Sequence, residues 1–528
     1  MTMQPVLIAG QWRAAQASGS FRAENPATQT PLAEEYPISR WEDIDAALDA
    51  ATAAAAILRT TPPEVIAEFL ERFAAHLERD RDALVEIAHL ETALPRKPRL
   101  ADVELPRTFN QLRSAARAAR EESWRLPTID TQLNIRSCHA PIGPVLVFGP
   151  NNFPFAFNSI AGGDFAAAIA TGCPVIAKAN TSHPGTTRLL AVCAQQAAEG
   201  AGLPAGSIQL IYRTSHPDGA RAVSDPRTGA TGYTGSRHAG LKLKSAADAA
   251  GNPIYLELSS INPMLMLPAA IQARGMAIAE EFTGSCLMGT GQFCTNPGLV
   301  ILLAGSATDT FVASLVERFK AAPVGTLLSR GVGDSLVASV STLQAAGAKV
   351  LAGGTPGGGN GYSFANTLLT VSAARFCAEP EKFQIEAFGN ASLLVIAQSP
   401  AEIVTVLKSL EGNLTGCIYS DTNGGDDELY RQFEPLLRQK VGRLLNDKMP
   451  TGVAVSPAMN HGGPYPSTGH PGFTAVGIPA ALRRFTALDC YDNVQGDRLP
   501  EVLRNTNPRK VWRCIDGNWT QAGIPSES

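Results

Sequence analysis

Long apolar runs, excess positive charge and a secretory leader are all missing from this chain of 528 residues. No stretch approaches the roughly 18 uninterrupted apolar residues that a membrane span requires. The formal net charge is −4 and the basic residues are scattered, which argues against a nucleic-acid-binding surface. The N-terminus, "MTMQPVLIAGQWRAAQ", lacks a basic segment followed by an apolar one, so it does not resemble a signal peptide. We therefore expect a soluble, cytoplasmic protein that binds neither membranes nor nucleic acids.

Paired cysteines are missing as well. The number of cysteines is odd, and no C-x-x-C pair occurs among Cys138, Cys173, Cys193, Cys286, Cys294, Cys377, Cys417, Cys490 and Cys514. Such usage predicts free thiols in a reducing compartment rather than a disulfide framework. No histidine stands beside Cys286 or Cys294 at the spacing of a zinc site, so the sequence predicts no metal.

What the chain does contain is an alternation of apolar runs and helical patterns. The first 110 residues are predicted to be mainly helical, with a clear amphipathic period at 62–80. From about residue 141, apolar runs at 144–148, 174–178 and 208–212 alternate with helical segments, and a similar texture resumes after Cys294. This alternation is typical of βαβ units. The sequence therefore predicts an α/β protein with two doubly wound lobes of similar build.

The ordinary dinucleotide fingerprint, G-x-G-x-x-G at a strand-to-helix turn, is also missing. The nearest substitute is "YTGSRHAG" (233–240), in which Gly235 and Ser236 follow a predicted strand and precede a predicted helix. A helix N-terminus in that place is able to receive a phosphate. A plain glycine turn explains the same residues, so this stretch alone decides nothing.

Four stretches carry side chains suited to chemistry. Asn152 follows the strand at 145–148, Lys178 ends another strand, Glu257 lies in the apolar run "IYLELSS", and Cys294 lies within "GTGQFCTNPG". Glycines and an Asn-Pro turn around a cysteine predict an irregular loop with an accessible backbone N–H, which a buried structural cysteine does not need. Each residue also has an ordinary interpretation: a turn cap, a solvated lysine, an ion-paired glutamate or a packed thiol.

The order and wording of these stretches resemble the aldehyde dehydrogenase superfamily over roughly residues 5–515. The motifs that carry the resemblance are "NNFP" (151–154), "YTGS" (233–236), "LELSS" (256–260), "GQFC" (291–294) and "IEAFGN" (385–390). Closer wording, such as "SSINPM" and "HGGPYPST" (461–468), resembles the branch containing 2,5-dioxovalerate (α-ketoglutarate semialdehyde) dehydrogenases and an NADP-dependent fatty aldehyde dehydrogenase. Two departures, the missing Trp before Asn-Phe-Pro and "ELSS" for E-L-G-G, spare the catalytic side chains.

The resemblance implies roles that agree with the chemistry of the residues. Cys294 would attack an aldehyde as a thiolate and form a thiohemiacetal. The Asn152 amide and the Cys294 backbone N–H would stabilise its oxyanion. After hydride transfer to a nicotinamide, Glu257 would activate water to hydrolyse the thioester. His461, in "NHGGP", matches a proton-accepting position of that branch, although a histidine before two glycines is more often a loop residue.

The resemblance also locates a cofactor site. NAD-preferring relatives usually carry a glutamate three residues after the strand-end lysine, and here Lys178 is followed at that distance by Thr181. A threonine leaves room for a 2′-phosphate, whereas a carboxylate would repel it. His216 occupies the place of an arginine used by NADP-dependent relatives, and Arg213 is the nearby substitute. We therefore predict NADP, with NAD still usable. The remaining cofactor residues implied are Gly235, Ser236, Glu386 and Phe388.

The family fold implies a domain layout. A dinucleotide-binding domain would take residues 1–122 and 142–266, and a catalytic domain residues 267–478. A small β oligomerisation element would combine a hairpin at 123–141 with a late strand within 479–500. This element implies a homodimer or homotetramer.

The substrate is the least determined feature. Phe153, Phe155, Phe293 and Phe388 are candidate pocket walls, with ordinary packing as the alternative. The resemblance favours 2,5-dioxovalerate, although no arginine is evident for its carboxylate, and a fatty or aliphatic aldehyde is the alternative. A CoA-acylating enzyme, which needs no water-activating base, and a catalytically silent binding protein on the same fold are the other possibilities considered.

Overall fold

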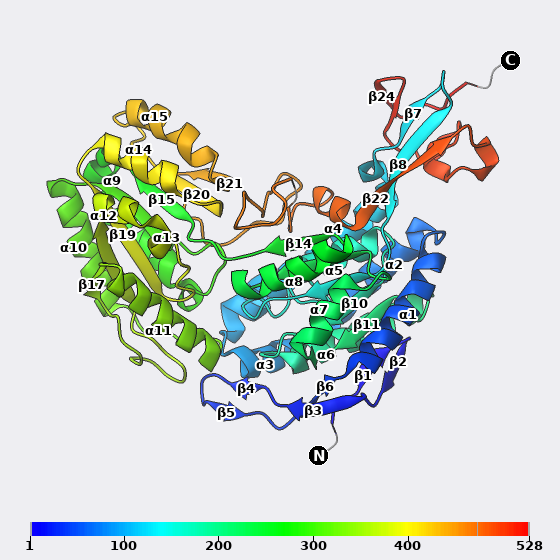
Figure 1. Cartoon of the computed structure of the whole chain (residues 1–528), viewed down its shortest axis with the longest axis horizontal. Coiled ribbons are helices and arrows are strands. Elements are labelled where there is room, and N and C mark those ends of the chain that lie inside the picture. Colours follow the sequence, from blue (N-terminus) through cyan, green and yellow to red (C-terminus); the bar gives the residue numbers. More distant parts are fainter. Residues whose placement is uncertain (1–2, 473, 526–528) are drawn as a thin grey trace.

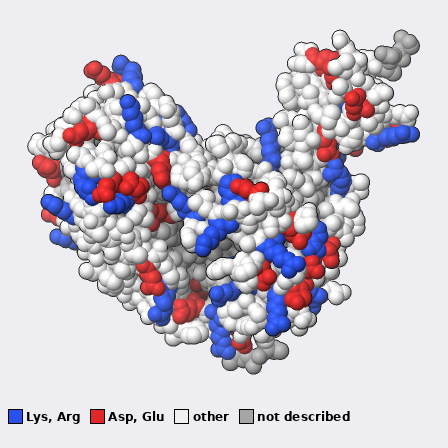
Figure 2. All heavy atoms as spheres, in the orientation of Figure 1, with Lys and Arg blue, Asp and Glu red and all other residues white. Residues whose placement is uncertain are grey.

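A computed structural model describes residues 3–472 and 474–525 and shows two α/β lobes with a projecting β arm (Figure 1). Each lobe has a seven-stranded sheet, and the arm has a five-stranded sheet. This confirms the predicted fold class. No helix within the described ranges is apolar and long enough to cross a bilayer. Figure 2 shows acidic and basic side chains interspersed over one face of the molecule.

The first lobe is built on a sheet of strand order β14-β13-β9-β10-β11-β1-β2. Its strands are β1 (Val6–Ile8), β2 (Gln11–Arg13), β9 (Val145–Phe148), β10 (Val175–Lys178), β11 (Ile208–Ile211), β13 (Ala230–Thr234) and β14 (Ile254–Glu257). The five strands from β9 to β14 run parallel, and β1 joins them antiparallel at Leu7↔Leu210. The three apolar runs predicted as strands are therefore β9, β10 and β11.

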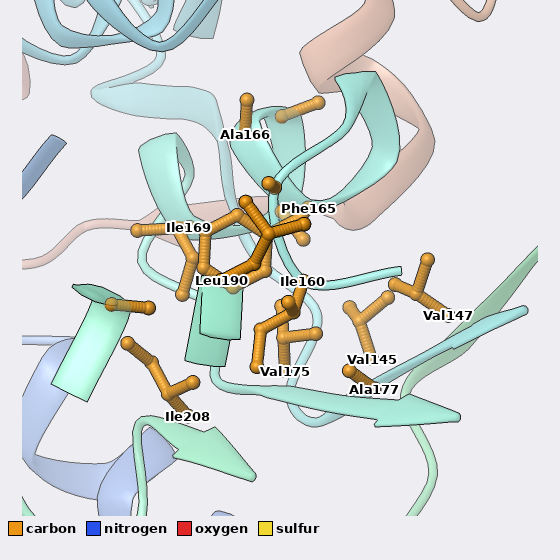
Figure 3. Packing of buried hydrophobic residues seen from close by; sticks show 14 of the residues in the cluster. Val145, Val147, Ile160, Phe165, Ala166, Ile169, Val175, Ala177, Leu190 and Ile208 are labelled. Atoms are coloured by element: carbon orange, nitrogen blue, oxygen red, sulfur yellow. The ribbon is translucent and has the colours of Figure 1, made fainter. Parts of the chain in front are cut away.

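Helices cover both faces of the first sheet, so its central parallel strands are buried. Figure 3 shows Phe165 and Ile169 packed over Val145, Val175 and neighbouring apolar side chains. These strand residues share a face because Val175 pairs in register with Val145, and side chains alternate along a strand. The helices of this lobe are α1 (Trp41–Leu58), α2 (Pro63–Arg79), α3 (Arg81–Thr92), α4 (Leu105–Glu121), α5 (Gly163–Ala170), α6 (Pro184–Ala201), α7 (His216–Ser224) and α8 (Arg237–Ala250).

The second lobe contains a sheet of order β17-β18-β19-β16-β15-β20-β21. Its strands are β15 (Pro263–Met266), β16 (Leu299–Leu303), β17 (Lys349–Ala352), β18 (Thr367–Ser372), β19 (Ala391–Ala397), β20 (Asn413–Tyr419) and β21 (Val441–Asn446). Its helices are α9 (Pro268–Leu287), α10 (Ser306–Ala321), α11 (Arg330–Ala345), α12 (Ala373–Ala378), α13 (Pro380–Phe383), α14 (Pro400–Ser409) and α15 (Asp427–Arg438). Since β15 pairs with β16 and β20, the chain changes sheet between Glu257 and Pro263, not after residue 266 as predicted.

The arm has the strand order β22-β8-β7-β23-β24. The predicted hairpin is β7 (Thr128–Asp130) and β8 (Ile135–Pro141), and the predicted late strand is β22 (Thr486–Asp492), which pairs antiparallel with β8. The prediction ended this element at residue 500, but β23 (Arg513–Ile515) and β24 (Asn518–Thr520) extend the same sheet. Strands of three residues leave too short an alternating pattern to be recognised from sequence.

The N-terminal region corrects a second prediction. Helices begin only at Trp41, and four further short strands precede them: β3 (Ala17–Phe21), β4 (Glu24–Asn25), β5 (Thr30–Pro31) and β6 (Tyr36–Ser39). A fifth strand of this region's sheets, β12 (Arg213–Thr214), pairs with β6 from far along the chain. Partners so distant in sequence cannot be read from a local pattern, which is why the first 40 residues were not recognised as strands.

Candidate active site

The candidate site lies at the carboxyl edge of the first sheet, facing the second lobe. Phe148 at the end of β9 is in register with Lys178 of β10 and with Tyr233 of β13, and Thr234 is in register with Glu257 of β14. Because these strands are parallel, their final residues meet at one edge. Three sequence-predicted residues therefore lie at this edge: Asn152, just after β9, Lys178 and Glu257.

Cys294 reaches this edge on a turn from the second lobe, as its glycine-rich setting predicted. The turn follows α9 and a short 3₁₀ segment in which Gly289 and Gly291 have φ of 55° and 69°. A Cβ at Gly291 would also overlap the backbone carbonyl of Gly389, so only glycine fits there. The Asn262 side chain fixes the turn by donating to the Cys294 carbonyl at 2.9 Å.

Three side chains meet at the sulfur. Cys294 Sγ lies 3.5 Å from His461 Nε2, and that nitrogen lies 2.7 Å from Glu257 Oε1. The side chains of His461 and Glu257 are 1% and 3% exposed. The ligand-type atoms of the three residues fall within 4.8 Å of one another, so they also have the types and spacing of a metal cluster. His461, for which an ordinary loop role was the more frequent alternative, is in contact with the sulfur.

The surroundings of Cys294 hold it as a neutral thiol. Burial raises its pKa well above the ordinary value, and the carboxylate of Glu257 raises it further. The Arg107 guanidinium acts in the opposite direction on the same thiol pKa. Attack on a carbonyl carbon therefore requires a nearby acceptor for the thiol proton, and His461 and Glu257 are placed to accept it.

Asn152 is 5% exposed and donates from Nδ2 to the Gln292 carbonyl at 3.0 Å. Gln292 precedes Cys294 by two residues, so this bond ties the strand-end loop to the cysteine turn. An amide nitrogen carries two hydrogens, and the second one remains available to a ligand oxygen. Arg99 holds the other side of the loop by donating to the Asn152 carbonyl at 3.0 Å.

A cavity of about 340 Å³ opens beside these residues. Its walls include most of the predicted site, namely Asn152, Gly235, Ser236, Glu257, Cys294, Glu386 and Phe388. Ser236 caps the N-terminus of α8 by accepting from the Ala239 N–H. Burial raises the pKa of the Glu386 carboxyl to about 7, against the opposing effect of a hydrogen bond from Ser259. The cavity thus combines a reactive thiol, a helix N-terminus and a titrating carboxyl.

A second cavity, of about 460 Å³, adjoins the first, and Ser329 lines both. Thr181 and Arg213 line the second cavity, as does Arg22, which the sequence did not indicate. His216 is exposed and is not among the lining residues. Lys178 ends β10 and is among the lining residues of neither cavity. Burial lowers its pKa to about 8, with a further lowering by Arg213. The two cavities, which share Ser329, together suit an elongated ligand.

Comparison with known proteins decides the family. The model of the aldehyde dehydrogenase family matches residues 12–435. The chain belongs to the aldehyde dehydrogenase family. It is 38% identical to α-ketoglutaric semialdehyde dehydrogenase 2 of Azospirillum brasilense, covering 98% of this chain and 99% of the relative. It is 34% identical to α-ketoglutaric semialdehyde dehydrogenase of Acinetobacter baylyi, covering 97% and 98%.

Solved structures agree on the fold. A variant of aldehyde dehydrogenase C from Pseudomonas syringae, determined with NAD+ and octanal, superposes with a TM-score of 0.78 at 21% identity, covering 93% of this chain and 97% of that one. The present aldehyde dehydrogenase is accordingly an oxidoreductase that acts on aldehydes. The sequence-based prediction of the family and the reaction type is confirmed.

Several residues of this aldehyde dehydrogenase site escaped the sequence analysis. Asn262 lies in the quoted "SSINPM" segment, but its contact with Cys294 joins residues 32 positions apart. Arg22, Arg99 and Arg107 stand in no motif. Of the four phenylalanines predicted as walls, Phe155 is packed in the core of the first lobe, Phe388 lines the first cavity, and Phe153 and Phe293 join a small cluster near Cys294.

Proposed function

We propose that this enzyme oxidises 2,5-dioxovalerate (α-ketoglutarate semialdehyde) irreversibly to the dicarboxylate, with NADP as the preferred cofactor. The two named relatives, similar over nearly their whole length, support the substrate. The observation that carries the reaction is the contact chain from Cys294 through His461 to Glu257. A candidate proton acceptor, His461, thus lies beside a half-buried thiol, with the Glu257 carboxylate behind it.

The first chemical step is attack by the cysteine sulfur. The thiol proton passes to His461 Nε2, while Sγ forms a bond to the aldehyde carbon and the carbonyl electron pair moves onto oxygen. The free hydrogen of the Asn152 amide and the Cys294 backbone N–H donate to that oxyanion. His461 Nε2 accepts this proton in the tautomer that carries its hydrogen on Nδ1. The Nε2–H formed in this step then donates to Glu257 Oε1, 2.7 Å away, so the imidazolium is paired with a carboxylate.

The second part of the reaction releases the acid. A nicotinamide held beside Cys294, Glu386 and Phe388 would supply the hydride acceptor, and loss of hydride from the former aldehyde carbon would leave a thioester on Cys294. Glu257 then takes a proton from water as the water oxygen attacks the thioester. The C–S bond breaks, the leaving sulfur takes back the proton held by His461, and Glu257 releases its proton to solvent. Glu257 Oε2 suits this role because it is buried with no hydrogen-bond partner among the described residues. This favours hydrolysis over transfer to CoA.

The two cavities fit a dinucleotide. The nicotinamide end would lie beside Cys294, with Glu386 and Phe388, and the pyrophosphate near Ser236 at the α8 N-terminus. The adenosine end would lie beside Thr181, where Arg22 and Arg213 supply positive charge. These two arginines support the preference for a 2′-phosphate, and neither pairs with a carboxylate among the described residues. His216 is not needed for this assignment.

We also propose a homodimer or homotetramer assembled through the arm, in a reducing, cytoplasmic compartment. β22 is an edge strand of the arm sheet, and Leu488 on it is 64% exposed. Trp512 and Trp519 of the arm are 49% and 54% exposed. An edge strand with apolar residues favours pairing with a second copy. All nine cysteines are free thiols, which supports the proposed reducing compartment. Mass measurement in solution that returned a monomer would contradict the assembly.

The function is tested by comparing substrates. We expect kcat/KM for 2,5-dioxovalerate to exceed that for octanal and for acetaldehyde, with 2-oxoglutarate and one equivalent of reduced cofactor as products. Adding CoA should not divert the product to a thioester. A higher kcat/KM for octanal would instead support the fatty aldehyde alternative, and formation of an acyl-CoA would exclude hydrolysis.

A further inference from the structure

Arg107 is a half-buried cation whose charge the site leaves available. It lies in the first turn of α4, and its guanidinium stacks on two rings, with centroids 5.7 Å away for Phe153 and 5.1 Å away for Phe157. Its Nε donates to Gln111 Oε1 at 2.9 Å, which orients the group. Its Nη2 is buried and has no hydrogen-bond partner within the described residues. An unpaired buried donor of this kind is costly and points to a ligand.

Two other arginines near the site are already engaged. Arg99 is ion-paired with Glu104 and donates to the Asn152 carbonyl. Arg443 donates through both terminal nitrogens to backbone carbonyls in the 450–452 loop. Both therefore hold chain segments in place. Arg107 has no ion pair among the described residues, and the nearby Glu104 carboxylate is taken up by Arg99 and by backbone N–H groups.

The position of Arg107 relative to the sulfur is set by Phe157. One side of this ring meets the Arg107 guanidinium, and the ring also packs against the His461 imidazole with centroids 5.8 Å apart. His461 in turn contacts Cys294. Helix α4 contributes no residue to the walls of the cavity assigned to the cofactor. Arg107 is thus connected to the sulfur through Phe157 and His461, apart from the walls of that cavity, and the inference below places the substrate tail on this side.

We propose that Arg107 binds the distal carboxylate of the aldehyde substrate and makes the enzyme selective for short ω-oxo carboxylates. This inference rests on the proposed function and identifies the recognition element for its substrate. The guanidinium fork matches a carboxylate in a bidentate geometry, and the phenylalanine rings line the path of the short methylene chain. A neutral aliphatic aldehyde in the same place would leave the Arg107 charge unpaired and would also shield it from water. The kcat/KM for such an aldehyde would therefore be lower than for the charged substrate.

The test compares charged and neutral aldehydes in matched variants. Wild type, Arg107→Gln, Arg107→Lys and the control Arg117→Gln would be assayed with 2,5-dioxovalerate and with pentanal, which has the same chain length without the carboxylate. Arg117 lies exposed on the same helix and carries the same charge. Because Arg107 also lowers the pKa of Cys294, its loss would slow both substrates. The ratio of the two kcat/KM values cancels that common effect.

We expect Arg107→Gln to lower this ratio by about 30- to 100-fold, as expected for the loss of a charge-assisted bidentate contact. The change should fall mainly on KM for 2,5-dioxovalerate. Arg107→Lys should recover part of the ratio, since it restores the charge without the fork, and Arg117→Gln should leave it unchanged. Glutarate, which carries the carboxylate but cannot react, should inhibit wild type competitively and Arg107→Gln at least about tenfold more weakly.

The outcomes separate the two hypotheses. If wild type prefers 2,5-dioxovalerate and Arg107→Gln keeps the wild-type ratio, Arg107 does not bind the carboxylate, although the proposed function stands. If wild type shows no preference for 2,5-dioxovalerate over pentanal, the proposed substrate is wrong, and this inference is overturned with it. A fall of the ratio in Arg117→Gln as large as in Arg107→Gln would also overturn the inference, because general surface charge would then explain the selectivity.

Discussion

The two ends of the joined cavities differ in how their charges are held. At the Cys294 end, His461 and Glu257 are almost completely buried and in direct hydrogen-bond contact. At the Thr181 end, Arg22 and Arg213 are exposed to solvent. Buried charges act at low dielectric and tolerate no loss of a partner, whereas exposed charges are screened by water and salt. Under the proposed function, the chemistry takes place at the buried end, and the choice between NADP and NAD is made at the solvent-exposed end.

The largest expected effect is at the sulfur. Cys294→Ala should reduce turnover at least about 10⁴-fold, because no other nucleophile can form the covalent intermediate. Steady-state assays and calorimetric titration with the cofactor would be run together. Cofactor binding should persist, since the side chain of Cys294 supplies only one part of the cavity wall. Turnover near the wild-type rate would contradict covalent catalysis and leave a binding protein on this fold as the better description.

Glu257→Gln should come next, with a loss of steady-state kcat of about 10²- to 10⁴-fold, as is typical for removal of a general base. The first turnover should be slowed far less than hydrolysis, since this substitution removes only the charge that pairs the imidazolium, so rapid mixing should still show a burst of reduced cofactor equal to the enzyme concentration. The burst arises because attack and hydride transfer precede the step that needs the base. Equal losses in the burst and in steady-state turnover would show that Glu257 acts before hydrolysis.

His461→Gln should slow the attack of the sulfur on the aldehyde, whereas Glu257→Gln should mainly slow hydrolysis. Without the imidazole 3.5 Å from the sulfur, the burst itself should slow by about 10²-fold, because the thiol loses its proton acceptor. Glu257→Gln is the matched comparison, since it should keep the fast burst. An unchanged burst rate in His461→Gln would return this residue to a packing role in its loop.

A smaller effect is expected at the open end. Arg213→Gln should lower the preference for NADP over NAD by about tenfold, the value of one charge-assisted contact to the 2′-phosphate. His216→Gln is the control, because His216 does not line the second cavity. The Arg213 effect should shrink at high salt. If His216→Gln lowers the preference as much as Arg213→Gln, the 2′-phosphate lies near His216, at the position that the family resemblance implied.

The smallest effect is a pH dependence of cofactor capture. With pKa values of about 7 for Glu386 and about 8 for Lys178, kcat/KM for the cofactor should peak between these values. Below the optimum the Glu386 carboxyl is protonated and loses acceptor capacity, and above it Lys178 loses its charge. NAD is the better probe, because it lacks the titrating 2′-phosphate. Glu386→Gln should flatten the acid limb only, and an unchanged acid limb would remove Glu386 from cofactor binding.

The fold was predictable where the chain is buried on both faces. Strands such as β9 and β10 are apolar runs followed by helices, and such runs are recognisable without any partner. The short N-terminal strands were not recognised, because β2 and β3 are mostly exposed and find their partners through long-range pairing. The same reason explains the missed β23 and β24. Local periodicity predicts central strands, and long-range pairing decides edge strands.

The sequence alone indicated the candidate reactive groups of this aldehyde dehydrogenase: the thiol of Cys294 in a glycine-rich loop, the carboxylate of Glu257 in an apolar run, and the family to which both belong. Only the tertiary structure decided which groups act on them. It brings His461 to the sulfur across 167 positions and Glu257 to His461 across 204 positions. It also leaves the Nη2 of Arg107 without a partner. Local geometry depends on residues that are neighbours in the sequence, whereas contacts between distant segments form only once the two lobes have packed.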